Sequence, residues 1–344
     1  MNTIEKLTKL TQLNAIASNE VQMTDYLKSS LKGNISTDRL GSVIASLGTG
    51  KSVMMSAPMD EFGLIVSQIT PKGLVKFQMV GGILSKNSVN QTFLLTTKKD
   101  TFIGVMGSKP LMNQSREELT KVDDLKSMYL DFGFKSQTEA FEKGVQIGDM
   151  VTRYSPLVEV LNDRVISKAL DSRSPVFVLS ELINKFNDLK VSFSAAFTAQ
   201  HKMSMKGSKT TSFKIEPEIA INLDTVETTD LVGDGSIVLG QGPVIFFYDQ
   251  GLIAHSKLRT FMIDLCKSNQ IPFQEGFQLS GFGEGHYLQL SKLGAATLSI
   301  GIPIRHKNGH NEMIDLKDLE HTEKLLKTFI ESLDDQVVDH ILYI

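Results

Sequence analysis

One stretch of the chain, residues 191–224, constrains the fold more than any other. It holds two apolar, β-rich segments, VSFSAAFTA and EIAINLD. The first segment runs into the polar residues Gln200, His201 and Lys202, and the second ends in Asp224. In open α/β sheets, ligands bind beyond the carboxyl ends of the strands. The stretch therefore predicts a site at one edge of a sheet, with these polar side chains gathered there.

The rest of the chain predicts an α/β domain. After about residue 156, β-rich segments such as ATLSIGIP alternate with helical ones such as PVFVLSELINKF. This alternation is typical of a mostly parallel sheet that helices cover on both faces. Near the N-terminus, residues 3–31 show the apolar spacing of two helices. Residues 43–47, 53–57 and 62–69 are predicted to be strands of the same domain.

A second type of pattern fills residues 70–156. Short β-rich runs, among them VKFQMV, TFLLTTKK and TFIGVMG, alternate there with glycine-containing and polar turns. This pattern predicts a small β-barrel-like domain inserted into the main one. We therefore predict an α/β domain from residues 1–69 and 157–344, interrupted by a β-rich domain from residues 70–156.

Composition excludes several classes of function. The 344 residues carry a net charge of -3, so no basic face for nucleic acid is expected. No run reaches the ~20 apolar residues of a membrane-spanning helix, and the N-terminal segment lacks the apolar core of a secretory signal, so we expect a cytoplasmic protein. The one cysteine, Cys266, excludes an internal disulfide and a cysteine-based zinc site.

Ten collinear segments resemble the glutamyl/deblocking, or tetrahedral, aminopeptidases, a family of dinuclear-metal peptidases whose members have also been labelled cellulases or endoglucanases. The segments are DRLGSVIA (38–45), PMDEFGLIV (58–66), IGVMGSKP (103–110), MYLDFG (128–133), GVQIGDMV (144–151), KALDSR (168–173), FTAQ (197–200), IAINLD (219–224), IPFQ (271–274) and IGIPIRHKNGHNE (300–312). The resemblance implies a three-layer α/β/α metallopeptidase-like domain with an inserted barrel. It also implies a site for two zinc or cobalt ions.

The family's metal ligands can be carried over position by position. Asp171 and Asp224 match two aspartate ligands of the family and are retained. The other three ligand positions hold Pro58, Lys202 and Asn308, where the family has histidine, glutamate and histidine. Proline has no side-chain donor or acceptor, and a lysine ammonium repels a dication. Two of the five ligands therefore remain.

The catalytic positions are also changed. Asp60, which in the family supports the first histidine ligand, is retained, but His201 stands where the family has its catalytic glutamate. In the turn SGFGEGH, Gly283 and Glu284 stand where the family has an aspartate that helps to hold the substrate amine. We therefore expect an inactive pseudo-peptidase with no bound metal and with a structural, regulatory or peptide-binding role.

Two alternatives keep some activity. In one, His201, His306 and His310 join Asp171 and Asp224 in a rewired or single-metal site, so that the chain remains a hydrolase. In the other, His201 acts as a general base without metal. Against a metal, Lys202 is expected to form an ion pair with Asp171 or Asp224 and so to satisfy the retained carboxylates.

The resemblance also implies assembly. In the family, the inserted β domain and the edges of the main domain build dimers that close into a shell of twelve subunits. This chain retains the insertion, so we expect a homo-oligomer, either a dimer or the dodecamer. A mixed shell with an active paralogue and a peptide ligand are further expected partners.

Overall fold

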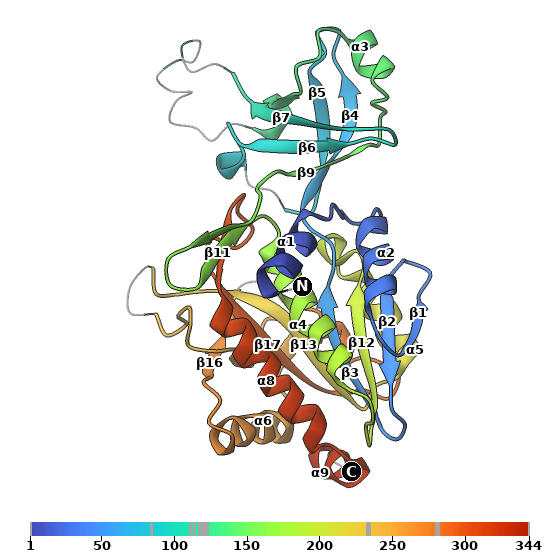
Figure 1. Ribbon diagram of the computed structural model, residues 1–344, viewed down its shortest axis with the longest axis vertical. Coiled ribbons are helices and arrows are strands. Elements are labelled where there is room, and N and C mark those ends of the chain that lie inside the picture. Colours follow the sequence, from blue (N-terminus) through green and yellow to red (C-terminus); the bar gives the residue numbers. More distant parts are fainter. Residues whose placement is uncertain are drawn as a thin grey trace.

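The computed structural model describes residues 2–82, 85–109, 112, 115, 124–231, 235–278 and 283–342. The described residues form a layered α/β domain, and a small closed β-barrel lies above it in Figure 1. Mixed α/β architecture with an inserted barrel is the fold class that the sequence predicts, and the structure confirms it.

The main domain is built on one mixed sheet whose central strands are parallel. The neighbours β12, β3, β13 and β17 run parallel to one another, while β14 pairs antiparallel with β17. Along the sheet the order is β1 (Asn34–Thr37), β2 (Val43–Leu47), β12 (Ser192–Thr198), β3 (Ser52–Pro58), β13 (Ile219–Glu227), β17 (Ala296–Ile304), β14 (Val244–Asp249) and β15 (Leu252–Ile253), with β16 (Gln274–Phe277) also paired to β14.

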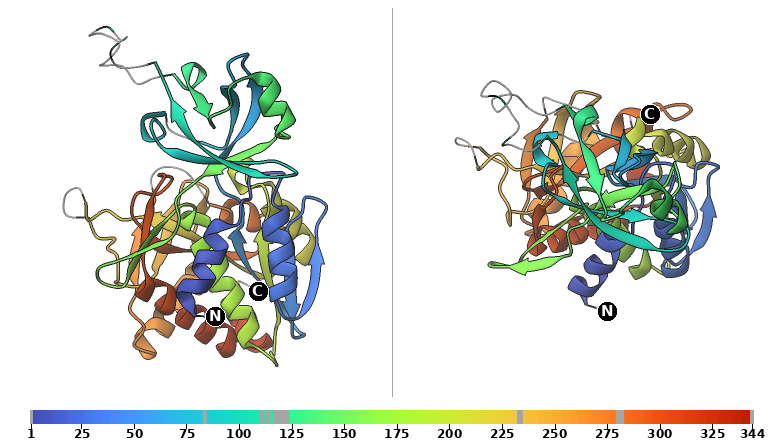
Figure 2. Two further views of the ribbon diagram at one scale, coloured as in Figure 1. Left: turned by 45° about the horizontal axis from the view of Figure 1, so that its top comes forward. Right: turned by 90° about the horizontal axis from the view of Figure 1, so that it is seen from above.

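Helices cover both faces of this sheet, as continuous apolar strands require. On β3, the side chains of Val53 and Met55 join the large core under α4, whereas Met54 joins a smaller cluster on the opposite face with Leu288. Figures 1 and 2 show the helices arranged around the sheet. They are α1 (Thr3–Gln12), α2 (Val21–Ser30), α4 (Leu170–Lys185), α5 (Lys206–Ile215), α6 (Ser256–Ser268), α7 (Gly285–Leu288), α8 (Leu316–Ser332) and α9 (Asp335–Ile341).

The inserted domain is a closed barrel with its own apolar core. Its strands, in order around the barrel, are β4 (Gly63–Ile69), β5 (Val75–Val80), β8 (Tyr129–Asp131), β7 (Thr101–Gly107), β6 (Thr92–Thr96) and β9 (Met150–Arg153), and α3 (Gln137–Glu142) packs beside them. The domain prediction assigned residues 62–69 to the main domain, but β4 pairs with β5 and β9 in the barrel. Alternating side chains identify a strand without identifying the sheet that it joins, so the predicted boundary falls one strand too late.

A small third sheet lies beside the main domain. It consists of β10 (Val158–Val160), β11 (Arg164–Ser167) and β18 (Glu312–Asp315), and β18 leads directly into α8. Asp315 caps α8 by accepting a hydrogen bond from the backbone N–H of Lys317. Among the described residues, no helix is both long and apolar enough to cross a membrane.

Candidate functional site

A cavity of about 520 Å³ lies where the central parallel strands end, next to the connection into the barrel. Five positions singled out in the sequence contribute to its wall: His201, Lys202, Asp224, Gly283 and Asn308. The remaining lining residues are Phe62, Ser204, Met205, Asn222, Thr225, Phe246, Asp249, Gln278, Ser299 and Lys307. The cavity thus brings together residues that are up to 246 positions apart in the sequence, from Phe62 to Asn308.

Lys202 forms an ion pair with Asp171, the first of the two retained carboxylates. Its Nζ lies 2.6 Å from Oδ2 of Asp171, and the two side chains are 7% and 1% exposed. The same ammonium lies 4.5 Å from the centre of the Phe62 ring, in a cation–π contact. Burial alone raises the pKa of Asp171, but the charge and hydrogen bond of Lys202 outweigh it and hold that pKa below its ordinary value. This is one of the two ion pairs that the sequence analysis considered.

A second lysine, Lys307, forms an ion pair with Asp224, the other retained carboxylate. Its Nζ lies 3.5 Å from Oδ1 of Asp224 and donates a hydrogen bond to the backbone carbonyl of Thr225. Burial raises the pKa of Asp224, yet the nearby Lys307, His201 and Lys202 lower it further than burial raises it. Each carboxylate that could have held a metal therefore has a lysine ammonium beside it.

Asp60 shapes the turn that carries His201 and Lys202. This fully buried carboxylate accepts the backbone N–H of His201 at 2.8 Å on one oxygen and that of Lys202 at 2.9 Å on the other. Burial raises the pKa of Asp60. Pro58, at the end of β3, is paired in register with Thr198 of β12 and contributes no side-chain ligand. Asp60 thus keeps a positioning contact to the turn, although the first histidine of the family motif is absent.

His201 is held by a carboxylate that sequence reasoning did not assign to it. Its Nδ1 lies 3.1 Å from Oε1 of Glu284, and the hydroxyl of Thr198 donates to the same oxygen at 2.5 Å. Burial lowers the pKa of His201. The hydrogen bond to Glu284 and the negative charges of Glu284 and Asp224 outweigh this effect, so the pKa lies above its ordinary value. The pair fixes the imidazole at the wall of the cavity.

Asn308 contributes backbone rather than side-chain contacts. Its N–H donates to Oε1 of the fully buried Glu312 at 2.8 Å, and its carbonyl accepts from Arg153 at 2.7 Å. The other oxygen of Glu312 accepts the N–H of Asp171 at 2.8 Å. Burial and the charge of Asp171 raise the pKa of Glu312 well above its ordinary value.

His306 and His310, the other two histidines of the expected rewired site, are not among the residues that line this cavity. The Nε2–H of His310 donates to the backbone carbonyl of Tyr154 at 3.3 Å, and the ring packs edge-on against Phe93 of the barrel. Burial lowers the pKa of His310 to about 4. The backbone N–H of His306 donates to Glu227. In the part of the chain that the structure describes, no group of three or more His, Cys, Asp or Glu side chains is arranged to hold a metal ion.

Several non-glycine residues at the site have positive φ, a backbone conformation that costs energy. They are Ala169 before α4, Gln200, Ser204 and Met205 after β12, and His306 and Asn308 after β17. The turns that carry these residues are therefore held in a strained backbone conformation.

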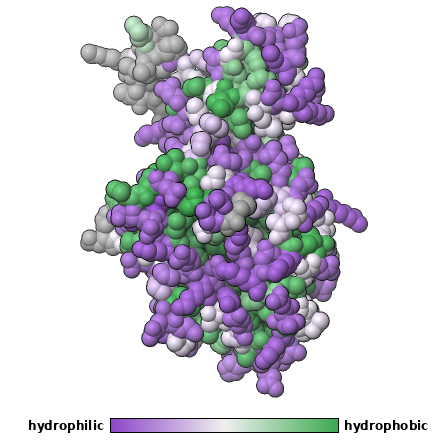
Figure 3. Space-filling view, viewed as in Figure 1, coloured by the Kyte–Doolittle hydropathy of each residue, from purple (hydrophilic) through white to green (hydrophobic). Residues whose placement is uncertain are grey.

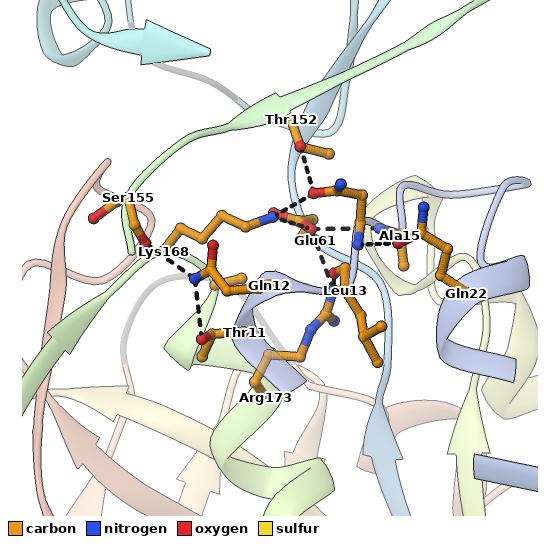
Figure 4. Close-up of polar contacts among 12 residues, drawn as sticks. Thr11, Gln12, Leu13, Ala15, Gln22, Glu61, Thr152, Ser155, Lys168 and Arg173 are labelled. Atoms are coloured by element: carbon orange, nitrogen blue, oxygen red, sulfur yellow. Dashed lines mark hydrogen bonds and ion pairs between the residues drawn. The ribbon is translucent and has the colours of Figure 1, made fainter. Parts of the chain in front are cut away.

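A buried ion cluster joins the two domains (Figure 4). Glu61, which is 2% exposed, accepts two hydrogen bonds from Lys168 at 2.9 and 3.0 Å and one from Arg173 at 3.2 Å. Asn14 accepts from both Lys168 and Thr152, so the cluster ties the N-terminal segment to barrel strand β9. Glu61 sits within the PMDEFG motif, but its contacts are those of an internal brace.

The residues present do not fit a pair of zinc or cobalt ions. Such ions need several carboxylate or imidazole ligands free of competing cations. Here an ammonium lies 2.6 Å from Asp171 and another 3.5 Å from Asp224. Sequence reasoning missed Lys307 and Glu284 as partners in the site, although Lys307 lies in the segment IGIPIRHKNGHNE and Glu284 in the turn SGFGEGH, because a sequence pattern does not give contacts between distant segments.

Comparisons of the sequence and the fold with known proteins find aminopeptidases. The model of the M42 glutamyl aminopeptidase family matches residues 41–325. A putative aminopeptidase from Acetivibrio thermocellus is 31% identical over 326 residues, which cover 93% of this chain and 96% of that protein. The solved structure of aminopeptidase APDkam598 from Desulfurococcus kamchatkensis matches with a TM-score of 0.94 and 29% identity, covering 99% of this chain and 98% of that one.

Two further solved structures bear on assembly and on the family's labels. The TET1 peptidase of Pyrococcus horikoshii, which can assemble into a tetrahedron or a large octahedral shell, matches with a TM-score of 0.88 and 28% identity over 96% of this chain and 100% of that one. A protein from Thermotoga maritima described as an endoglucanase matches with a TM-score of 0.80 and 28% identity, covering 98% of this chain and 99% of that one.

Proposed function

Because the chain belongs to the M42 glutamyl aminopeptidase family, we propose that it is a peptide-binding member of that family without metal-dependent peptidase activity. Its fold is that of the family, and the proposal is that its site chemistry differs. The proposal includes the absence of a resident metal ion.

One observation carries this proposal: a lysine ammonium lies beside each of the two retained carboxylates. A Lys202 ammonium 2.6 Å from Asp171 and a Lys307 ammonium 3.5 Å from Asp224 supply the positive charge that these carboxylates need. A dication entering the same space would have to displace or deprotonate both lysines. It would also lack the ligands that Pro58 and Asn308 do not provide.

The second candidate is a hydrolase with a rewired site. It is favoured by the contact between His201 and the buried Glu284, since a carboxylate that orients an imidazole is a common arrangement for a general base. Against this candidate, His310 packs on Phe93 rather than toward Asp171 and Asp224. A single-metal site would have to form around His201 and Asp224 beside two lysines.

Metal content and peptidase activity test the proposal directly. Protein purified without chelator should contain well under one zinc or cobalt ion per chain, and aminoacyl substrates should be cleaved no faster with added zinc or cobalt than without. About two metal ions per chain, or an activity that a chelator abolishes, would overturn the proposal. Cleavage that resists chelators and is lost in His201→Gln would instead favour the second candidate.

A reversion variant shows whether the scaffold itself still supports the family chemistry. The changes Pro58→His, His201→Glu, Lys202→Glu and Asn308→His restore the family residues at the three replaced ligand positions and at the catalytic position. Metal binding by this variant would show that the replaced side chains alone account for the loss. The matched control carries only Pro58→His and Asn308→His, which leaves Lys202 on Asp171 and should bind no metal.

The same scaffold supports a proposal of self-association. Three large apolar side chains on barrel strands are exposed: Met79 on β5 by 43%, Ile103 on β7 by 51% and Val105 on β7 by 42%. Figure 3 shows apolar residues gathered on the exposed barrel surface. Exposed apolar patches of this kind are typical of interfaces. We propose that the chain forms a homo-oligomer of at least two copies. We also propose that the same interface allows mixed assembly with an active paralogue.

A further inference from the structure

We propose that an exposed apolar and basic surface of the main domain binds an anionic lipid surface. It consists of the exposed side chains of residues 206–216, on and just after α5, and of residues 290–294, in the turn that follows α7. We call it the α5–α7 surface. It lies on the main domain, whereas the surface proposed for self-association lies on the barrel (Figure 1). The inference goes beyond the proposed function and depends on neither metal nor peptide binding.

Three large apolar side chains project from the α5–α7 surface. Leu293 is 104% exposed, Leu290 67% and Phe213 63%. The turn that carries the two leucines is fixed against α5, because Oγ of Ser291 donates a hydrogen bond to the backbone carbonyl of Ser212 at 2.7 Å. The three side chains therefore belong to one patch. Contiguous exposed apolar patches mark sites where a protein contacts another protein or a membrane.

Two lysines hold their ammonium groups over aromatic rings of the same region. Nζ of Lys292 lies 3.9 Å from the centre of the Phe213 ring. Nζ of Lys209 lies 4.0 Å from the centre of the Tyr287 ring on α7. In such contacts the aliphatic part of the lysine covers apolar surface while its charge stays at the edge. Lys206 lies on the same face of α5 as Lys209 and is also exposed.

The charge of this surface is opposite to that of the rest of the chain. Residues 206–216 and 285–295 contain four lysines and a single acidic residue, Glu216, which gives a net charge of +3. The whole chain carries -3, so the remaining residues carry -6. An anionic surface therefore attracts this face and repels the others, and such a charge distribution orients the molecule on approach.

A lipid surface fits these features better than a protein partner does. Leu293 projects fully from a turn, and lipid closes around a projecting side chain without a matching pocket. Leucine and phenylalanine beside lysine are typical of interfacial contacts, in which apolar side chains enter about 5–10 Å into the headgroup and acyl boundary. Each lysine near anionic headgroups adds a favourable interaction. The chemistry of the α5–α7 surface thus matches both layers of an anionic membrane interface.

Sedimentation of the full chain with lipid vesicles tests the proposal. One set of vesicles contains phosphatidylcholine alone, and the other contains phosphatidylcholine and phosphatidylglycerol in equal amounts. We expect the chain to bind the anionic vesicles at least about tenfold more tightly than the neutral ones. Salt at about 1 M, which shortens the Debye length to about 3 Å, should weaken the binding to anionic vesicles at least about tenfold.

Leucine variants locate the apolar contact. The double variant Leu290→Ser, Leu293→Ser should weaken binding to anionic vesicles at least about tenfold, because both side chains lose the gain of leaving water. The matched control is Leu161→Ser. Leu161 is also an exposed leucine in a turn, 84% exposed between β10 and β11, but Glu159 and Asp163 lie beside it in the sequence. The control should bind as the wild type does.

Lysine variants locate the basic contact. The double variant Lys209→Gln, Lys292→Gln should weaken binding to anionic vesicles at least about tenfold and leave the weak binding to neutral vesicles unchanged. The control Lys317→Gln, Lys327→Gln makes the same change in net charge at two exposed positions of α8. It should bind anionic vesicles as the wild type does.

A fluorescent reporter shows insertion without relying on a loss of binding. The chain has no tryptophan, so Leu293→Trp carries a single one. Its emission should shift to shorter wavelength with anionic vesicles, whereas that of Leu161→Trp should not. Thermal melting checks that every variant folds, and the reporter decides the question if a serine variant does not.

Four results would overturn the inference. They are no binding to anionic vesicles, equal binding to anionic and neutral vesicles, binding that neither the leucine nor the lysine variant weakens, and no shift in Leu293→Trp. Light scattering and polyglutamate identify the alternatives. A lower mass of Leu290→Ser, Leu293→Ser than of the wild type would assign the surface to contacts between copies of this chain. Salt-sensitive binding of polyglutamate without binding of anionic vesicles would assign it to an acidic protein.

Discussion

Replacing Lys202 with methionine is the most direct test of the ion pair on which the site is built. Methionine keeps most of the aliphatic chain but removes the ammonium. In the wild type, Nζ lies 2.6 Å from Oδ2 of Asp171 in a nearly buried pair. For unit charges at that distance, Coulomb's law with an effective dielectric constant of about 20 gives about 6 kcal/mol, before the cost of desolvating both groups is subtracted.

The net effect is smaller than this attraction but still large. Removing one partner of a buried pair leaves the other charge uncompensated, which typically costs about 3–5 kcal/mol. Glu312, whose side chain accepts the N–H of Asp171, adds a second acidic group beside the buried, uncompensated charge. We therefore expect Lys202→Met to lower the free energy of unfolding by about 3–5 kcal/mol. The double variant Lys202→Met, Asp171→Asn should recover part of that loss.

Urea unfolding followed by far-ultraviolet circular dichroism measures the effect, since the chain has no tryptophan. The matched control is Lys327→Met, which removes the lysine of an exposed pair with Glu331 on α8 and should change stability by less than about 1 kcal/mol. Adding zinc to Lys202→Met should not restore stability, because the ligand shell is still short of side chains. A variant as stable as the wild type, or one that zinc stabilises, would refute the reasoning.

Other parts of the structure give three further predictions. Glu61→Gln should lower the free energy of unfolding by about 3–5 kcal/mol, because it leaves Lys168 and Arg173 buried without their carboxylate; an equal loss in the exposed control Glu331→Gln, measured by urea unfolding, would contradict this. Burial raises the pKa of Asp318 to about 7, so its stabilising contribution is complete below the unfolded value near 3.8 and is lost as pH rises to about 7. Between these values, wild-type stability should fall by about 1.4 kcal/mol per pH unit relative to Asp318→Asn, and parallel stability curves for the two proteins would exclude the effect. Light scattering at micromolar concentration should give a mass of at least two chains, and a mass of about 38 kDa would show that the interfaces are lost.

Sequence patterns alone predicted the type of fold and its layers. The apolar strand segments around residues 191–224 and 300 are continuous rather than alternating, and this pattern requires cover on both faces of a sheet. The barrel was predicted from short runs between turns, but its first strand was assigned to the wrong domain. A strand's own residues do not specify which strands it pairs with. Only a short connection separates β3 from β4, although β3 belongs to the main sheet and β4 to the barrel.

The chemical identity of the site residues was likewise visible in the sequence, since proline has no side-chain donor or acceptor and a lysine ammonium has no lone pair to offer a metal. Which charge meets which was decided only by the tertiary structure. The sequence left two partners for Lys202, Asp171 and Asp224. In the structure, the turn held by Asp60 directs Lys202 to Asp171. Lys307 reaches Asp224 from a loop 83 residues away, and Glu284 reaches His201 from a similar separation. Such pairings depend on how distant strands end at one edge of a sheet, a geometry that arises from packing the whole chain and not from any local pattern.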